Sequence, residues 1–267
     1  MMEAVPEAAG TPNGGPGTKA QFSVYVLALS WEPAFCCTSA GKSKGECKEM
    51  MGTYGADHMT LHGLWPNYSD AEAPSPTQTY PQYCSPYGSC KKQSSAGCTP
   101  DPKTIPAEMS KYGPGYVTDN YSLADHEWPR HGSCTGLDSG TFFQTELDTL
   151  KALPGEGTPS ILKPGATVKR TDLAASFGQA DAVMLQCNAN GELSQVEICY
   201  GVDAGGKPTT LTACPENARK TPYDNSCEVG DPSHGQAPVD TVKIPVAGQF
   251  SSGGGSSSGG STPSGTG

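Results

Sequence analysis

Histidine is scarce in this sequence, and three of the five histidines fall in two short segments that also hold other proton-transferring or charged groups. The first segment reads LHGLWP at 61–66, and the second reads HEWPRHGSC at 126–134. Imidazole can stay neutral in one copy and charged in another at about pH 5 to 7. The two segments together can therefore supply the base and the acid of one reaction.

The spacing within the second segment places four reactive groups on one small surface. Glu127 and His131 are four residues apart, as are His126 and Arg130, so on a helix each pair shares a face. Inside a helix, Pro129 would remove a hydrogen bond and clash with the carbonyl four residues earlier. We therefore expect a helix that begins near residue 125 or 126, with Pro129 close to its first turn.

Each of these residues also has an ordinary explanation when it is taken alone. A single histidine is usually a surface residue or a satisfied core group, and a Trp-Pro pair is usually packing. Arg130 and Glu127 could form a simple surface ion pair. The combination of both segments in one chain favours a catalytic site instead.

Four segments have the β-branched and aromatic content of strands that cross a core. The Asn190-Gly191 pair between the last two is a hairpin-turn signal, which predicts antiparallel pairing. The four segments are 21–31, 58–65, 182–187 and 195–200.

Two helices are expected among these strands. The segment 141–153 has one apolar face, and a second short helix is expected to carry the segment that begins near Tyr121. Strands and helices do not alternate strictly, so we predict an α+β fold with a central antiparallel sheet flanked by helices. The apolar face of 141–153 consists of Phe142, Phe143, Leu147 and Leu150.

The ends of the chain differ in composition from its middle. Residues 1–20 and the Gly/Ser-rich 246–267 have no means of burying themselves, so we expect a flexible lead-in, a folded domain at 21–245 and a tail or linker. Residues 1–20 also lack the apolar core of a signal peptide, which suggests a mature form whose leader has been replaced by a start Met. No apolar run reaches the roughly 18 residues that a membrane span needs.

Eleven cysteines indicate a disulfide framework formed in an oxidising compartment, so we expect a secreted or periplasmic protein. The odd number leaves at least one thiol unpaired. Zinc is the competing explanation, but the sequence has no C-x-x-C knuckle, and we expect neither a metal nor another cofactor.

The formal net charge is −10 and the isoelectric point is about 4.9. Such a charge repels a polyanion at long range and excludes a protein that coats nucleic acid non-specifically. It does not exclude an enzyme acting on nucleic acid, because the reaction needs only a few local cations.

The two reactive segments resemble the active-site segments of the ribonuclease T2 family, whose usual forms read H-G-L-W-P and H-E-W-x-K-H-G-T-C. The preceding YVLALSWEPAFC and the later LQC and GELSQVEIC also resemble that family, its bacterial periplasmic members in particular. The resemblance covers nearly all of residues 21–230. It implies the T2-type fold and a monomeric, metal-independent endoribonuclease of broad base specificity that acts on single-stranded RNA.

The resemblance also implies a reaction and the role of each site residue in it. The ribose 2′-hydroxyl attacks its own 3′-phosphate to give a 2′,3′-cyclic phosphate, and slow hydrolysis to a 3′-phosphate follows. His131 is then the general base and His62 the general acid, with an acidic optimum. Glu127 and Arg130 stabilise the pentacoordinate phosphorus, while His126 helps to hold the phosphate.

Two positions depart from the family pattern. Arg130 stands where the family has lysine, and it keeps the charge and suits phosphate but cannot give up a proton. Ser133 replaces the usual threonine. Charge stabilisation should survive the first change, whereas a proton-donating role would not.

The resemblance further suggests residues that contact the base. Trp65 resembles the aromatic on which the family stacks the base, and stacking tolerates every base; packing is the equal alternative for this tryptophan. Asn67 and Tyr68 are expected to adjust base preference.

Most of the cysteines can be paired by the same resemblance. It gives Cys84 with Cys134, Cys187 with Cys227, and Cys199 with Cys214. Apart from the resemblance, we also expect Cys90 with Cys98, and Cys47 with either Cys36 or Cys37.

Two other functions compete with the ribonuclease. One is a protein of the same fold that binds a protein or cell-surface partner and has lost catalysis, an idea that Arg130 invites. The other is a disulfide-rich binding module with incidental histidines, which would need two family segments by chance.

Overall fold

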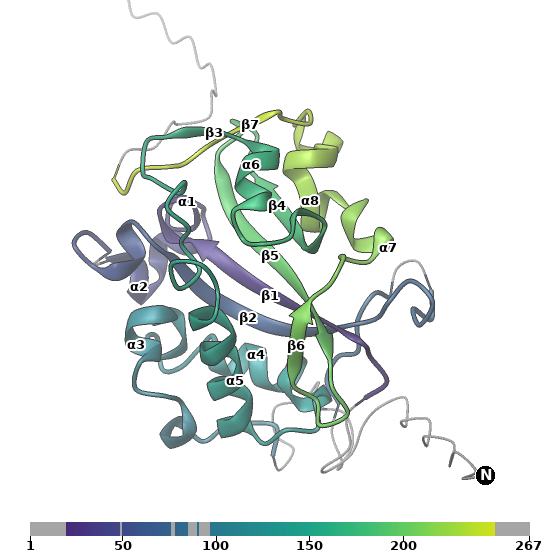
Figure 1. Ribbon diagram of the computed structural model, residues 1–267. Helices are drawn as coiled ribbons and strands as arrows, with labels where there is room; N and C mark the ends of the chain where they lie inside the picture. Colours follow the sequence, from purple (N-terminus) through teal and green to yellow (C-terminus); the bar gives the residue numbers. More distant parts are fainter. Residues whose placement is uncertain (1–19, 49, 76–77, 85–89, 91–96, 249–267) are drawn as a thin grey trace, which may run out of the picture.

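The computed structural model describes residues 20–48, 50–75, 78–84, 90 and 97–248. The predicted lead-in and tail lie almost wholly outside these residues. A five-stranded antiparallel sheet forms the centre, in the order β2-β1-β5-β4 with β6 beside β5 (Figure 1). Its strands are β1 (Val24–Trp31), β2 (Met59–Asn67), β4 (Val183–Cys187), β5 (Leu193–Val202) and β6 (Pro208–Leu211).

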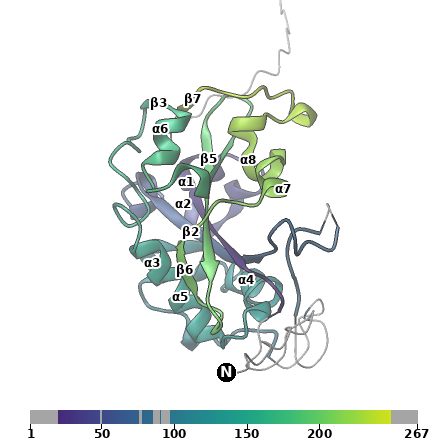
Figure 2. The same cartoon turned by 45° about the vertical axis from the view of Figure 1, so that its right-hand side comes forward.

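Helices gather in two groups around this sheet, which confirms the α+β prediction (Figures 1 and 2). One group comprises α3 (Met109–Tyr112), α4 (Ala124–Arg130) and α5 (Ser139–Lys151); the other comprises α6 (Arg170–Ala175), α7 (Glu216–Arg219) and α8 (Pro222–Val229). The short helices α1 (Glu32–Phe35) and α2 (Gly45–Lys48) follow β1. A small second sheet pairs β3 (Thr167–Lys169) with β7 (Thr241–Lys243).

The two faces of the sheet have different surroundings because side chains alternate along each strand. In β1, residues 25, 27, 29 and 31 enter the main core, whereas Val24 and Val26 join a smaller apolar cluster. Helix α5 contributes its predicted apolar face to the main core. Helix α8 covers the free edge of β4, where Asn225 and Ser226 accept backbone N–H bonds, and this blocks further strand pairing.

A β-bulge in β2 determines which side chains of the strand face the main core and which face away from it. Ala28 pairs with Gly63 and Leu29 pairs with Leu61, so His62 is the extra residue between them. The bulge allows Leu61 and Leu64, three residues apart, both to face the main core. Bulges re-aim side chains in this way near functional sites.

Both predicted helices are present with shifted ends. Helix α5 begins two residues before the predicted 141, because the Asp138 side chain accepts the Thr141 backbone N–H at 3.0 Å and caps the helix there. Helix α4 begins at Ala124, so Pro129 lies in its second turn, and the prediction that it sits near the first turn was wrong. The missing proline N–H is tolerated because α4 ends one residue later.

Five disulfides form, and all agree with the expected pairings: Cys36–Cys47, Cys84–Cys134, Cys90–Cys98, Cys187–Cys227 and Cys199–Cys214. The alternative that sequence left open is resolved in favour of Cys36, and Cys37 is the free thiol. Among the described residues, no helix is long and apolar enough to cross a bilayer.

Candidate active site

The bulge in β2 and the end of α4 bring the two reactive segments together. His62 Nε2 lies 3.9 Å from Glu127 Oε1, and the donor atoms of His126, Glu127 and His131 all lie within 4.8 Å of one another. The backbone N–H of His131 donates to the Glu127 carbonyl at 2.9 Å, which continues the helical turn past Arg130. The predicted four-residue spacing thus places these groups on one surface.

Trp65 connects the two segments. Its indole N–H donates to Glu127 Oε2 at 2.8 Å, and its ring stacks on His131 at 5.5 Å between centroids. It also meets the edge of His62 at 5.2 Å. Trp65 therefore contacts Glu127, His62 and His131 at once, which goes beyond the packing role considered from the sequence.

Glu127 has no exposed surface, and burial raises its pKa to about 8. The Trp65 hydrogen bond and the positive charge of Arg130 act in the opposite direction but are weaker. Burial penalises the carboxylate because a charge loses its hydration there. In mildly acidic solution Glu127 is therefore a neutral carboxylic acid that can donate a hydrogen bond to an anionic oxygen.

Burial lowers the pKa of both central histidines, and their other neighbours modify the effect in different directions. Burial lowers the pKa of His131 well below its usual 6.5, and the positive charges of Arg130, His126 and His62 lower it further. Burial also lowers the pKa of His62, but the hydrogen bond that its ring donates to Gln195 Oε1 opposes that effect. A neutral His131 and a protonated His62 can therefore coexist below pH 6.5.

Arg130 is anchored by a residue that the sequence did not indicate. Its Nη2 donates to the Tyr80 hydroxyl at 2.5 Å, and its carbonyl accepts the Tyr83 backbone N–H at 3.0 Å. The Tyr80 ring also lies 5.6 Å from the His131 ring. No motif includes Tyr80, because a long loop brings it back to the site.

Several buried polar atoms in this site have no hydrogen-bond partner among the described residues. Such atoms are costly to leave unpaired and are uncommon in folded proteins. Their concentration here favours a bound group with several polar oxygens. The atoms are Glu127 Oε1, Arg130 Nε and His131 Nδ1.

Two of the residues predicted to contact the base are almost fully buried. Tyr68 is 7% exposed and packs into the main core, and Asn67 is 9% exposed. His126, by contrast, is exposed at the edge of the site. A contact of Asn67 or Tyr68 with a base stays a prediction.

Gln195 is a second residue that the sequence did not indicate as functional. It is 8% exposed, and its Oε1 lies 2.8 Å from His62 Nδ1. The two residues are 133 positions apart, so only the pairing of β1 with both β2 and β5 brings them together.

A cavity of about 690 Å³ opens beside His62, lined there by His126 and Gln195 as well. Lys44 and Glu46 also line it, together with residues of α1 and the turn that follows. Because His62 borders this cavity, a chemical group released next to His62 has space to occupy within the cavity.

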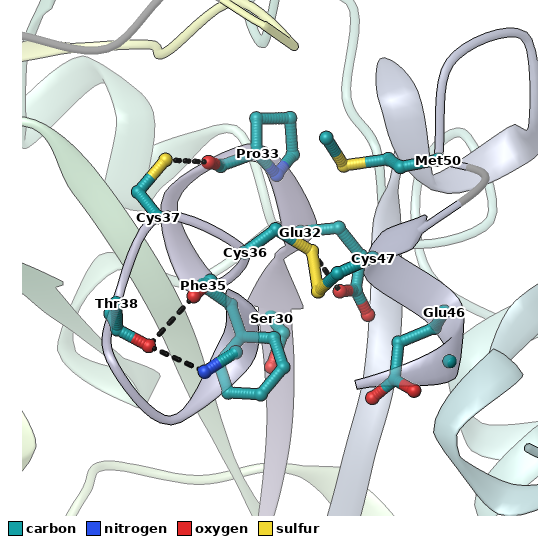
Figure 3. The surroundings of a disulfide bond; sticks show 12 residues. Ser30, Glu32, Pro33, Phe35, Cys36, Cys37, Thr38, Glu46, Cys47 and Met50 are labelled. Atoms are coloured by element: carbon teal, nitrogen blue, oxygen red, sulfur yellow. Dashed lines mark hydrogen bonds between the residues drawn. A yellow bond between two sulfur atoms is a disulfide. The ribbon is translucent and has the colours of Figure 1, made fainter. Parts of the chain in front are cut away.

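The α1 wall of the cavity contains the free cysteine. Figure 3 shows the Cys36–Cys47 disulfide beside the buried Glu32, with the Cys37 thiol directed away from the disulfide to the Pro33 carbonyl, 3.0 Å away. Burial raises the pKa of the Cys37 thiol to about 11, so it is a thiol and a poor nucleophile at neutral pH.

Among the residues that the structure describes, two groups of side chains have the donor types of a metal site. The cluster of Glu32, Cys36 and Cys47 cannot act as one while its cysteines form a disulfide. The other cluster consists of His126, Glu127 and His131. These are the groups that the reaction predicted from the sequence uses for proton transfer and for the phosphate.

Position 63 has no room for any side chain, so glycine is required there. A Cβ at this position would lie 2.1 Å from Glu127 Oε2 and 2.5 Å from Trp65 Nε1. We expect Gly63→Ala to lower the cleavage rate on RNA about 100-fold, because small displacements of reacting groups have effects of that size. Overpacking should also reduce the free energy of unfolding by about 1 to 3 kcal/mol in urea titrations. Gly205→Ala, at an exposed turn, is the matched control, and equal activity of the two variants would contradict the steric argument.

Comparisons with known proteins identify the family of this chain. The sequence profile of the Ribonuclease T2 family matches residues 22–214. The chain is 27% identical to ribonuclease I of Escherichia coli strain K12 over 215 residues, which cover 72% of this chain and 80% of that protein. It is 26% identical to intracellular ribonuclease LX of Solanum lycopersicum over 200 residues, which cover 70% and 76%.

Solved structures show the same fold. The crystal structure of Actibind, described as a T2 ribonuclease, matches with a TM-score of 0.55 and 18% identity over 93% of this chain and 94% of that one. The structure of RNase NT in complex with 5′-AMP matches with a TM-score of 0.52 and 22% identity over 85% and 99%.

Proposed function

This chain belongs to the Ribonuclease T2 family and is an RNA endonuclease, and we propose that it cleaves single-stranded RNA by transesterification with His131 as base and His62 as acid. His131 takes the proton of the ribose 2′-hydroxyl, whose oxygen attacks the adjacent phosphorus. The bond to the 5′-oxygen breaks as His62 gives that oxygen a proton. The products are a 2′,3′-cyclic phosphate and a 5′-hydroxyl strand, and water then opens the cyclic phosphate to a 3′-phosphate.

The placement of His62 and His131 beside the same buried carboxyl, Glu127, is the observation that carries this proposal, and the directions of the two pKa shifts support the assignment of the roles. A general base must be neutral and a general acid must be protonated at the same pH. The pKa of His131 is held well below 6.5, whereas the Gln195 hydrogen bond supports the protonated form of His62. The reversed roles would require the histidine with the more strongly depressed pKa to hold the proton.

The phosphorus gains charge during the attack, and preorganised donors near it supply the largest stabilisation. Arg130 provides a fixed cation, and neutral Glu127 provides a carboxyl O–H to a phosphoryl oxygen. His126, exposed beside them, helps to hold the phosphate. Arg130 thereby keeps the charge that the family's lysine supplies.

The two sides of the scissile phosphate have different surroundings. The base on the 5′ side lies against Trp65 and Tyr80, where aromatic stacking accepts any base and gives broad specificity. The leaving nucleoside enters the 690 Å³ cavity, because His62, which protonates its oxygen, borders that cavity.

The remaining features follow from the same scheme. The reaction needs no divalent metal, because the side chains alone supply base, acid and cation. Five disulfides suit a protein that works outside the reducing cytosol, so we place it in the periplasm or in the secreted fraction. We further propose that it acts as a monomer.

The pH dependence of cleavage tests this proposal. Activity should rise as His131 loses its proton and fall as His62 loses its own, and both pKa values are lowered from 6.5. We therefore expect a bell-shaped profile for kcat/KM with its maximum below pH 6.5. The assay uses single-stranded RNA with EDTA at pH 4 to 8, and ³¹P NMR identifies the terminal phosphate.

Several results would contradict it. A requirement for a divalent metal, a maximum above neutral pH, or fragments without a cyclic phosphate would each overturn the mechanism. Intact RNA at every pH would favour a binding protein of the same fold.

A further inference from the structure

His62 is the first member of a buried chain of hydrogen bonds that runs away from the site. Its Nδ1 lies 2.8 Å from Gln195 Oε1, and Gln195 Nε2 donates to Glu197 Oε1 at 2.8 Å. Gln186 Nε2 donates to the same oxygen at 2.8 Å from the neighbouring strand. Glu197 is 1% exposed, so this chain ends in the interior.

The strand register explains why these side chains meet. Gln195 and Glu197 are two residues apart in β5 and therefore project from the same face. Gln186 of β4 pairs directly with Gln195. The bulge that leaves His62 without a partner in β1 is what permits its ring to reach the amide across that strand.

The hydrogen-bond donors and acceptors in this chain indicate how the Gln195 amide is oriented between Glu197 and His62. Glu197 Oε1 receives two N–H bonds, so it accepts whether or not the other carboxyl oxygen holds a proton. The NH₂ end of the Gln195 amide faces Glu197 and its carbonyl faces His62, an arrangement that places the proton of the neutral Glu197 carboxyl on Oε2. A carbonyl oxygen only accepts, so His62 Nδ1 holds a hydrogen in both protonation states of the ring.

We propose that Gln195, oriented by Glu197, is the positioning residue of His62: it keeps the hydrogen on Nδ1 so that the transferable proton is always on Nε2. Nε2 is the nitrogen that faces Glu127 at 3.9 Å, on the side of the reacting groups. An isolated neutral imidazole has no such constraint and exchanges between two tautomers. The inference rests on the proposed function, in which His62 is the acid.

Other charged groups face this chain and must be considered in any pH dependence. His126, Glu127 and His131 surround the His62 ring from the side of α4, and Tyr116 donates to the His62 carbonyl at 3.0 Å. Near Glu197, α8 contributes Asp224 and Tyr223. Burial raises the pKa of Glu197 well above its usual value, so Glu197 is neutral at the acidic pH of the reaction.

The test uses Gln195→Met, which keeps length and volume but removes the acceptor. Neutral His62 should then move its hydrogen to Nε2, which ¹⁵N NMR of histidine-labelled protein reports directly. The pKa of His62 should fall, because burial remains while the opposing hydrogen bond is lost. The alkaline limb of the kcat profile therefore moves to lower pH, and kcat falls about tenfold with little change in KM.

Glu197→Met tests the orienting role separately. It leaves Gln195 in place but frees its amide to rotate, so we expect a mixture of the two His62 tautomers and a smaller loss of kcat. In Gln186→Met, Glu197 loses the other N–H bond that it accepts, of the same 2.8 Å length, while the contact between His62 and Gln195 stays intact. This variant should leave the His62 tautomer and the alkaline limb of the kcat profile unchanged. Gln144→Met, on the exposed face of α5, is the remote control for glutamine replacement.

The outcomes separate this inference from the proposed function. If Gln195→Met keeps the hydrogen on Nδ1 and its alkaline limb stays in place, the positioning role is wrong, although His62 remains the acid. If Gln186→Met moves both readouts as much as Gln195→Met does, the effect is structural and the inference also fails. A native protein that leaves RNA intact contradicts the proposed function, while the NMR measurement still determines the tautomer.

Discussion

Replacing either His62 or His131 by phenylalanine lowers kcat for RNA cleavage by about 10³- to 10⁴-fold, the upper range for loss of a general acid or base. Phenylalanine keeps a planar aromatic ring against Trp65 but has no nitrogen that could hold or accept a proton. The measurement is single-turnover cleavage of a short RNA across the acidic range. The double variant should be little worse than either single one, because the two groups act in the same step.

His234→Phe is the matched control for these variants. His234 is an exposed histidine that bonds Asp231 outside the site, so its loss should leave cleavage unchanged. Substantial cleavage by either His62→Phe or His131→Phe would show that another group moves the proton and would reject the proposed pair.

Removing the Cys84–Cys134 disulfide has the largest expected effect on stability. This bridge closes a loop with a sequence separation of 50, and both cysteines are buried. The entropy of an open loop of that length predicts a loss of about 4 kcal/mol in the free energy of unfolding for Cys84→Ala/Cys134→Ala. Urea unfolding under non-reducing conditions measures it.

The same double variant should also lower activity. The bridge joins the loop that carries Tyr80 to the segment that carries Arg130, and the Tyr80 hydroxyl anchors the guanidinium. We expect the rate on RNA to fall at temperatures where the variant is still folded. A rate equal to that of the native protein would show that the loop keeps its position without the bridge.

Cys90→Ala/Cys98→Ala serves as the comparison. Its sequence separation is only 8, so loop entropy predicts a smaller loss of about 2 to 3 kcal/mol. A larger loss in this variant than in Cys84→Ala/Cys134→Ala would contradict the loop-length argument.

Local pattern in the sequence predicted four of the seven strands and two of the eight α-helices of the described residues. The strand segments, the apolar face of α5 and the Asn190-Gly191 hairpin were all predicted, because side-chain period and turn chemistry depend on near neighbours. Both reactive segments were also identified, since their residue types are close together in the chain. Three of the five cysteine pairings came from resemblance, and the structure confirms all five.

Helix ends were less accurately predicted. The proline rule predicted a helix that begins near residue 125 or 126 with Pro129 close to its first turn, whereas α4 begins at Ala124 and has the proline in its second turn. Packing of Trp128 and burial of Glu127 outweigh the loss of one backbone N–H.

Only the tertiary structure determined how the site is assembled. The bulge at His62, the anchoring of Arg130 by Tyr80 and the contact of His62 with Gln195 each depend on residues far apart in the chain. The raised pKa of Glu127 depends on complete burial. Sequence spacing specifies which groups are neighbours along one element, whereas desolvation and contacts between strands exist only after the chain has folded.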